Sequence, residues 1–273
     1  MSDIVLTAGV RANLLQLQST AATITNTQSK LATGKRVNTA LDNPINFFTA
    51  QGLSNRASDL TNLLDSMSTA ISTIQAANNG LTSITKLVQS AQALASQAQQ
   101  TSDVTVRAGL AAQFDSVKTQ IDQLAGDSGF NGINLLDSAN STNLTVQLNE
   151  RNTSSVTVNA VDSTSTGLAI NKATNNWAAA ADITAASGEL TAALTTLRSQ
   201  SQAFGSQLST VQIRQDFTKA MVNTLQSGSD ALTLADSNEE GANLLALQTR
   251  QQLSTTALSL ASQASQAVLR LFQ

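Results

Sequence analysis

The chain lacks histidine, cysteine and tyrosine altogether, and it has one tryptophan and one proline among 273 residues. Without histidine or cysteine, it cannot use the commonest metal ligands, a Ser-His or Cys-His nucleophile, or a disulfide bond. Aromatic residues make up only 3% of the chain, whereas a compact globule of this length usually buries more aromatic bulk. We therefore expect no enzyme activity, no cofactor and no metal, and close packing of long, thin helices.

Charge is also scarce, since Asp, Glu, Lys and Arg together make up 12% of the residues, about half the usual share. The 15 basic residues are outnumbered by 18 acidic ones, so the chain has no basic surface for a nucleic acid. No apolar run reaches the length of a membrane span. The first eight residues have neither a basic region nor a long apolar run, so we expect no cleaved signal peptide.

What the chain does have is heptad spacing of apolar residues, typical of helices that pack along one face. The first such pattern predicts a helix from Ile4 to Thr33 that ends at Gly34. Its predicted contact residues are Val10, Leu14, Leu17, Ala21, Ile24 and Leu31.

A second helix is predicted from Pro44, capped by Asn43, to about Gln100. It would be about 85 Å long at 1.5 Å per residue, which is longer than a compact domain and indicates an elongated bundle. Asn78 interrupts its apolar pattern, and Asn79-Gly80 predicts a local weakness. The core residues predicted on this helix include Leu64, Met67, Ile71, Ile74, Leu81, Ile84, Val88 and Leu94.

Lys86 is the only charged residue between Asp65 and Asp103. A neutral face of this kind either contacts solvent or is covered by other copies of the chain, where buried charges would be costly. The composition favours the second explanation.

A third helix is predicted from a cap at Asp103 to Gly126, and the spacing then changes from the helical to the strand period. This change predicts a β-hairpin at about 143–160, with Glu150 and Arg151 in a solvated turn. The alternating apolar residues of the hairpin are Leu144, Val146, Leu148, Val156 and Val158.

Helical spacing returns near Asn175 and is predicted to end at Gly228. The predicted core residues of this helix include Leu194, Leu197, Phe204, Leu208 and Val211. A capping box formed by Ser237 and Glu240 then predicts the start of the last helix. The apolar stripe of that helix includes Leu244, Leu247, Leu258, Val268 and Leu271.

Together these patterns predict a mainly α protein: an elongated antiparallel helical bundle or coiled coil with one small β-hairpin. Isolated helices are marginal, so we expect the N-terminal and C-terminal helices to pair. The expected domains are a terminal-helix domain (1–33 and 237–273), two connecting segments (34–43 and 229–236) and a rod domain (44–228).

Four segments of the chain carry a family resemblance. They are Leu31-Ala32-Thr33-Gly34-Lys35-Arg36-Val37-Asn38 with Ala40 and Asp42, Gly80-Leu81 with Ile84, Phe130-Asn131-Gly132, and the Ala-, Gln- and Leu-rich end from Leu244 to Leu271. In their order and spacing they resemble flagellin, in its short form without extra outer domains and of the alphaproteobacterial type. The resemblance implies a structural subunit of the bacterial flagellar filament, in which the terminal helices form an inner coiled-coil tube. It also implies chain ends that fold only on assembly.

The resemblance further implies an extracellular location, reached through the flagellar type III export apparatus. The implied partners are many copies of the same chain, other flagellins, an export chaperone, and the junction and cap proteins. The hairpin, Asn143–Val158, is either a switch between two subunit states or a plain clamp on the rod. Flagellins that activate the innate flagellin receptor typically carry an Arg, Arg-Glu-Leu pattern on the second helix. This sequence has Ser90, Gln92, Ala93 and Leu94 there, of which only Leu94 matches, so we expect weak or absent activation.

Two other structural roles stay open: a hook–filament junction protein, which shares terminal helices with flagellin, and a coiled-coil signalling rod. The carboxylates Asp236, Glu239 and Glu240 have an ordinary explanation at a helix start, where the macrodipole favours negative charge. No residue stands out as a nucleophile or base.

Overall fold

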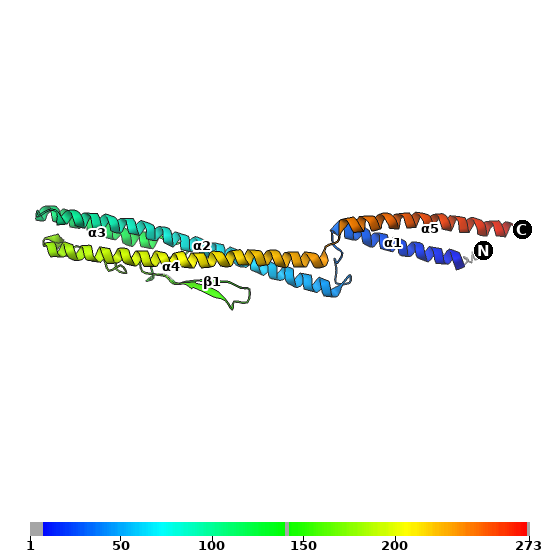
Figure 1. The fold of residues 1–273 in the computed structure, drawn as a ribbon, viewed down its shortest axis with the longest axis horizontal. Helices are drawn as coiled ribbons and strands as arrows, with labels where there is room; N and C mark the ends of the chain where they lie inside the picture. The colour runs from blue at the N-terminus through cyan, green and yellow to red at the C-terminus, as the bar shows by residue number, and fades with distance from the viewer. Residues whose placement is uncertain (1–7, 140–141, 272–273) are drawn as a thin grey trace. The chain divides into compact units, whose positions relative to one another are not determined.

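The computed structural model describes residues 8–139 and 142–271, except for the side chains at 8, 265 and 268–271. Its elements are α1 (Ala8–Thr33), α2 (Pro44–Gln99), α3 (Val104–Asp127), β1 (Leu144–Gln147), β2 (Ser155–Val158), the 3-10 helix η1 (Thr174–Trp177), α4 (Ala180–Thr233) and α5 (Ser237–Leu271) (Figure 1). The predicted mainly α fold with one small hairpin is confirmed. Of the described helices, none has a stretch long and apolar enough to cross a membrane.

The chain divides into two compact units. The terminal unit contains residues 1–55 and 224–273, and the central unit contains residues 56–223. In the terminal unit, α1 and α5 pack against one another, so the predicted pairing of the first and last helices is confirmed. They run antiparallel, because Lys30 in the last turn of α1 contacts Glu240 in the first turn of α5.

The two links of the terminal unit are hydrogen-bonded to each other. The N–H of Ala235 donates to the carbonyl of Gly34 (2.9 Å), and the N–H of Arg36 donates to the carbonyl of Thr233 (2.8 Å). Gly34 has a φ of 66°, which favours glycine, and it ends α1 as predicted. Segments about 200 residues apart in sequence therefore form one junction.

Helix starts follow local capping chemistry. The Asn43 side chain accepts from the N–H of Asn46 (3.0 Å), and the Asp103 side chain accepts from the N–H of Thr105 (2.8 Å), as predicted for α2 and α3. The predicted capping box at Ser237 is wrong, because the cap of α5 is Asp236, whose carboxylate accepts from the N–H of Asn238 (2.8 Å).

The predicted helix end at Gly228 is wrong, and Gly80 has a packing role that the sequence did not indicate. Helix α4 passes through Gly228 and ends at Thr233, and a Cβ at Gly228 would lie 3.4 Å from Leu53. Gly80 is buried within α2, and a Cβ there would clash with Ser128 and lie 2.7 Å from Leu136. Gly80 therefore permits a close approach between α2 and the residues Ser128 and Leu136, whereas a Cβ at Gly228 would make only an ordinary contact.

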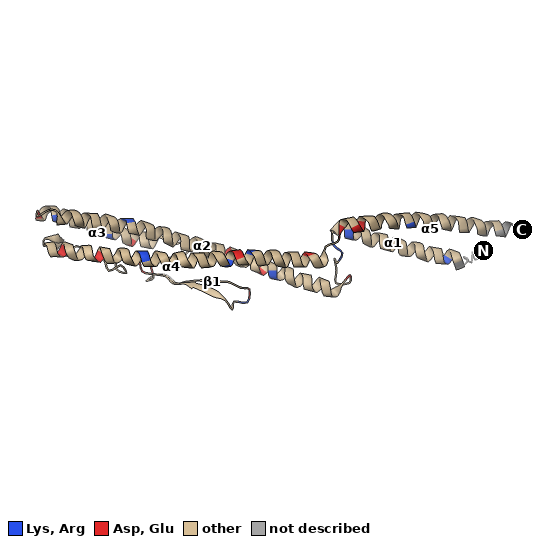
Figure 2. Ribbon diagram, in the orientation of Figure 1, with Lys and Arg blue, Asp and Glu red and all other residues tan. Residues whose placement is uncertain are grey.

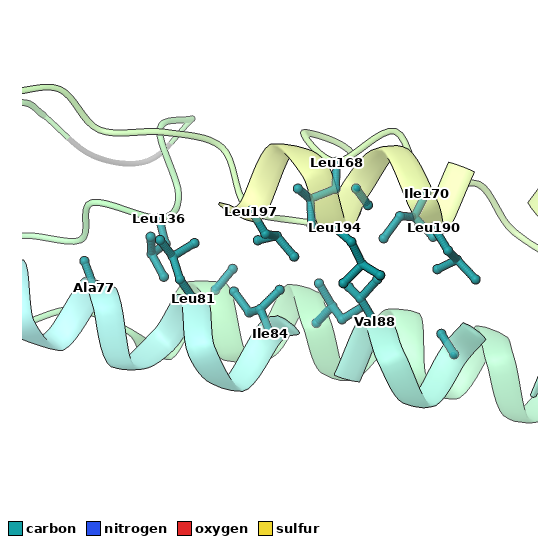
Figure 3. Close-up of a cluster of buried hydrophobic side chains, with 14 of the residues drawn as sticks. Ala77, Leu81, Ile84, Val88, Leu136, Leu168, Ile170, Leu190, Leu194 and Leu197 are labelled. Carbon is teal, nitrogen blue, oxygen red and sulfur yellow. The ribbon is translucent and has the colours of Figure 1, made fainter. Parts of the chain in front are cut away.

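The core of the central unit lies between α2, α3 and α4. Figure 3 shows Leu81, Ile84 and Val88 of α2 facing Leu194 and Leu197 of α4. All the predicted core residues belong to this cluster or pack against it. Buried ones are Met67, Ile74, Leu81, Ile84, Val88, Leu194, Leu197, Phe204 and Val211, and partly buried ones are Leu64, Ile71, Leu94 and Leu208.

The polar residue in the α2 pattern has a partner on α4. The Asn78 amide oxygen accepts a hydrogen bond from the hydroxyl of Ser201 (2.9 Å). Both groups are therefore satisfied within an otherwise apolar contact.

Residues 159–179, here called the strap, return from the hairpin to α4 and are held by carboxylates. Asp122 of α3 accepts from the N–H (2.7 Å) and hydroxyl (2.9 Å) of Ser165, which is fully buried. Asp115 of α3 accepts from the N–H of Ala173 (3.0 Å). The strap also adds Leu168 and Ile170 to the core, so this short connection completes the bundle.

The end of the strap is not helical where helical spacing begins in the sequence. Asn175, Asn176 and Trp177 have φ values of 47°, 51° and 59°, and α4 starts only at Ala180. The turn inserts Trp177 into the core, where its ring centroid lies 5.0 Å from that of Phe114. This buried contact holds the strained turn in place.

Candidate functional site

The contact face of α1 contains more polar residues than predicted. Val10, Leu17, Ile24 and Leu31 are partly or fully buried, and the positions between them are occupied by Asn13, Thr20 and Thr27. Leu14, which we predicted on this face, is 41% exposed. The prediction erred because it counted only apolar residues, whereas threonine can pack once its hydroxyl bonds within the helix, as Thr20 does to the carbonyl of Gln16 (2.8 Å).

On α5 the matching face contains Leu244, Leu247 and Leu258, all partly buried. Gln251 and Ser254 complete its heptad spacing. The side chains of Val268 and Leu271, which we also predicted on this face, lie outside the described residues. No described side chain of α5 is fully buried, so the α1–α5 pair buries little apolar surface.

A second set of apolar side chains on these helices faces away from the pair. We call them the open leucines, and they are Leu14 and Leu15 of α1 and Leu245, Leu253 and Leu260 of α5. Leu253 is 67% exposed. The acidic residues of α5, Glu239 and Glu240, lie in its first turn (Figure 2), and Arg250 is the only charged residue from Gly241 to Leu269, so this part of the helix offers a largely neutral surface.

The hairpin lies against α2 and forms the second candidate surface. Val146 pairs with Val156, and Leu144 pairs with Val158, in an antiparallel register. Leu144, Val146, Leu148 and Val158 are buried, and Val156 is partly buried. The predicted alternation of the hairpin is therefore confirmed by its burial.

Beside the hairpin is a cavity of about 600 Å³, here called the hairpin groove. The amide oxygen of Gln147 is buried without a hydrogen-bond partner among the described residues, which is an uncommon state for a native polar group. The groove is lined mainly by polar residues, including Asp59, Asn62, Ser66 and Thr69 of α2, Asn131, and Thr145, Gln147 and Glu150 of the hairpin.

We predicted Glu150 in a solvated turn, and this is wrong, because its side chain forms an ion pair with Arg56 of α2. Its carboxylate lies 2.8 Å from Nε of Arg56 on α2, and its side chain is only 16% exposed. Its own backbone N–H and the Arg56 charge hold the pKa of Glu150 below its usual range. Arg151 is exposed, as expected. The hairpin turn is thus fixed to α2 by one ion pair.

Arg107 of α3 is a structural residue that no sequence pattern indicated. Its Nε donates to the carbonyls of Ala98 (3.2 Å) and Thr101 (2.7 Å), and its Nη1 donates to the carbonyl of Ala178 (3.1 Å). One guanidinium therefore joins the end of α2, the following link and the end of the strap. From the sequence alone this arginine cannot be distinguished from a solvated one, because its partners are backbone carbonyls, one of them 71 residues away.

The carboxylates give no reactive cluster. Asp236 caps α5, and Glu240 pairs with Lys30 at 3.0 Å. Within the described ranges, no group of three Asp or Glu side chains could hold a metal ion. The features that the chain presents are packing surfaces.

The chain is similar to known proteins over its whole length. Residues 7–141 match the bacterial flagellin N-terminal helical region. The chain is 32% identical to flagellin FljM and 31% identical to flagellin FljK of Caulobacter vibrioides, in each case over all of this chain and 99% of the relative. A crystal structure of Bacillus cereus flagellin aligns with 57% of this chain and 88% of its own, at 24% identity and a TM-score of 0.48.

Proposed function

The chain belongs to the bacterial flagellin family and is a structural subunit of the extracellular flagellar filament, and we propose that α1 and α5 form the inner coiled coil of that filament. In this proposal, residues 1–33 and 237–273 are the inner-tube domain and the central helices with the hairpin are the rod. The connecting segments, 34–43 and 229–236, join the two, and the second of them includes the last residues of α4. The observation that carries the proposal is the set of open leucines, which the chain itself does not cover.

Burial of these leucines by neighbouring copies would drive assembly. Identical copies joined by unlike surfaces form an open helix unless their rotation closes a ring. Burying one leucine contributes about 1.5–3 kcal/mol, so many copies together gain a large free energy. A stripe of leucines on each copy therefore supports a filament better than a dimer.

Leu253 offers a direct test. We expect Leu253→Gln to raise the critical concentration for polymerisation by about ten- to a hundredfold, given about 1.4 kcal/mol per tenfold. The neighbouring exposed Gln252→Ala is the matched control and should leave it unchanged. Sedimentation of filaments from monomer measures both. Polymerisation of Leu253→Gln at the wild-type concentration would contradict the proposed surface.

The terminal helices fold on assembly in this proposal. Among the described side chains of α5 none is fully buried, and the contact faces of the α1–α5 pair contain the polar residues Asn13, Gln251 and Ser254, so the pair is marginal without neighbours. Ordering it costs conformational entropy, which burial against other copies offsets. Circular dichroism should show more helix per chain in filaments than in monomers, and equal helix content would rule out coupled folding.

For the hairpin we propose a switch role, in which its position against α2 differs between two subunit states. The hairpin groove and the unpartnered Gln147 oxygen support this, because they leave room and an unused acceptor for a second arrangement. Glu150→Gln weakens the Arg56 contact without changing size, and it should alter filament shape in electron micrographs while rod stability stays close to wild type. An unchanged shape would favour a plain clamp.

We also propose specific binding partners and an export route, both on the basis of family membership. They are other flagellins in the filament, an export chaperone, and the junction and cap proteins, with export through the flagellar type III apparatus and without a cleaved signal peptide. Co-purification from export-competent cells tests the chaperone. N-terminal sequencing of filament protein tests cleavage.

A further inference from the structure

The chain contains two Asn-Gly pairs in very different backbone settings. Asn131-Gly132 forms the tip of a two-residue turn, in which the N–H groups of Phe130 and Ile133 each donate to the other's carbonyl (2.8 and 3.0 Å). The φ values of Asn131 and Gly132 are 49° and 80°, as in the primed turns that favour this dipeptide. Both residues are exposed. Asn79-Gly80, in contrast, lies inside α2.

We propose that Asn131 is a site of spontaneous deamidation, whereas Asn79 is protected. In this reaction the backbone nitrogen of Gly132 attacks Cγ of Asn131. A bond forms between these two atoms, the bond from Cγ to Nδ2 breaks, and ammonia leaves with the amide proton. Water then opens the resulting succinimide ring at either carbonyl and gives aspartate or isoaspartate. Water is the only co-reactant.

The turn leaves the reacting atoms accessible. Among the described residues, no hydrogen bond uses the N–H of Gly132, so this nitrogen can lose its proton to solvent. A Cβ at Gly132 would meet no atom within 4 Å, so nothing packs over the site. Ring closure requires rotation about the backbone of Asn131, and this rotation disturbs only one small turn.

The same rotation at Asn79 would break α2. The N–H of Gly80 lies in the helical hydrogen-bond ladder, and Gly80 is buried against Ser128 and Leu136. Opening the helix here exposes the core around Leu81 and Ile84, which are both almost fully buried. The fold, rather than the Asn-Gly sequence itself, therefore decides which of the two Asn-Gly pairs deamidates.

Deamidation of Asn131 would change the hairpin groove. Asn131 lines that groove together with Asp59 and Glu150, so the new carboxylate adds a third negative charge to it. The isoaspartate product also inserts one extra backbone atom into a turn of two residues, which the two hydrogen bonds between Phe130 and Ile133 cannot accommodate unchanged. This step does not depend on filament assembly.

Peptide mapping by mass spectrometry tests the proposal. The purified full-length monomer is held in mildly alkaline buffer, either native or in denaturant, and replacement of the amide NH₂ by OH is followed at both pairs. In the native chain we expect Asn131 to convert at least about tenfold faster than Asn79, because Asn79 requires local unfolding. In denaturant the two should convert at similar rates.

The Asn131→Asp chain supplies the aspartate standard and should gain no further mass at the turn. Equal rates at Asn131 and Asn79 in the native chain would overturn the proposal. So would an Asn131 that stays intact in the native chain while it converts in denaturant.

Discussion

The ammonium group of Lys30 lies 3.0 Å from the carboxylate of Glu240, and this ion pair joins the last turn of α1 to the first turn of α5. The Glu240 side chain is 13% exposed and the Lys30 side chain 39%. The pair is therefore partly shielded from solvent at the base of the terminal helices. It fixes which end of α5 lies beside which end of α1.

The first prediction concerns this pair. Glu240→Gln removes the ion pair and a negative charge near a helix N-terminus, so we expect a loss of up to about 1 kcal/mol per chain. The critical concentration for polymerisation should rise by up to about fivefold at low salt and less at high salt. Glu239→Gln, on the same turn and exposed, is the control. A salt-independent effect would show that the charge is not responsible.

The second prediction concerns Arg107. Arg107→Ala removes charge-assisted hydrogen bonds to three carbonyls, so the free energy of unfolding of the central unit should fall by about 2–3 kcal/mol. Arg107→Lys should recover only part of this, since an ammonium group lacks the planar set of donors. Denaturant unfolding measures both, with the exposed Arg198→Ala as control. Full stability of Arg107→Lys would mean that charge alone suffices.

The third prediction concerns the pH dependence of the link after α1. The N–H groups of Thr39 (2.8 Å) and Asn38 (3.0 Å) donate to the Asp42 carboxylate, and these bonds lower the pKa of Asp42. A lowered folded-state pKa means that the stabilisation is fully present above the unfolded value of about 3.9 and is lost as pH falls below it. We therefore expect this link to open in acid.

Amide exchange, corrected for the intrinsic pH effect, checks this expectation. Protection of the Thr39 N–H should decline below about pH 4 in the wild-type chain. In Asp42→Asn it should be lower at neutral pH and independent of pH. Constant protection of the wild type through this range would exclude the carboxylate as its cause.

The fourth prediction contrasts two helical glycines. Gly80→Ala should cost about 1–3 kcal/mol, because its Cβ would meet Ser128 and Leu136. Gly205→Ala in α4, with nothing within 4 Å of its Cβ, should instead stabilise by about 0.5–1 kcal/mol through helix propensity. Thermal unfolding measures both. If both variants were stabilised, the close approach at Gly80 would not be a constraint.

Local signals in the sequence predicted the parts of the fold that depend on neighbours along the chain. Asn43 and Pro44 start α2, Gly34 ends α1, and the alternation from Leu144 to Val158 forms the hairpin. Each follows from propensity and capping within a few residues.

The predictions from sequence were wrong or incomplete where segments far apart in sequence determine the role of a residue. Gly80 looks like a weak point of its helix, but it is the residue that allows Ser128 and Leu136 to approach α2. Leu14 fits an apolar heptad, yet Asn13 and Thr20 occupy the contact face of α1. The partners of Arg107 are carbonyls that no local pattern predicts. A filament subunit adds a further difficulty, because its exposed leucines follow the same spacing as its core residues.

The hydrogen bond between Asn78 and Ser201 also disfavours alternative alignments of α2 and α4. Moving α4 by one heptad in either direction would place Leu194 or Leu208 opposite Asn78. The amide oxygen, in a partly buried position, would then lose its partner, at a cost of about 1 kcal/mol. One polar pair in a mostly apolar contact thus helps to set the register of the two longest helices.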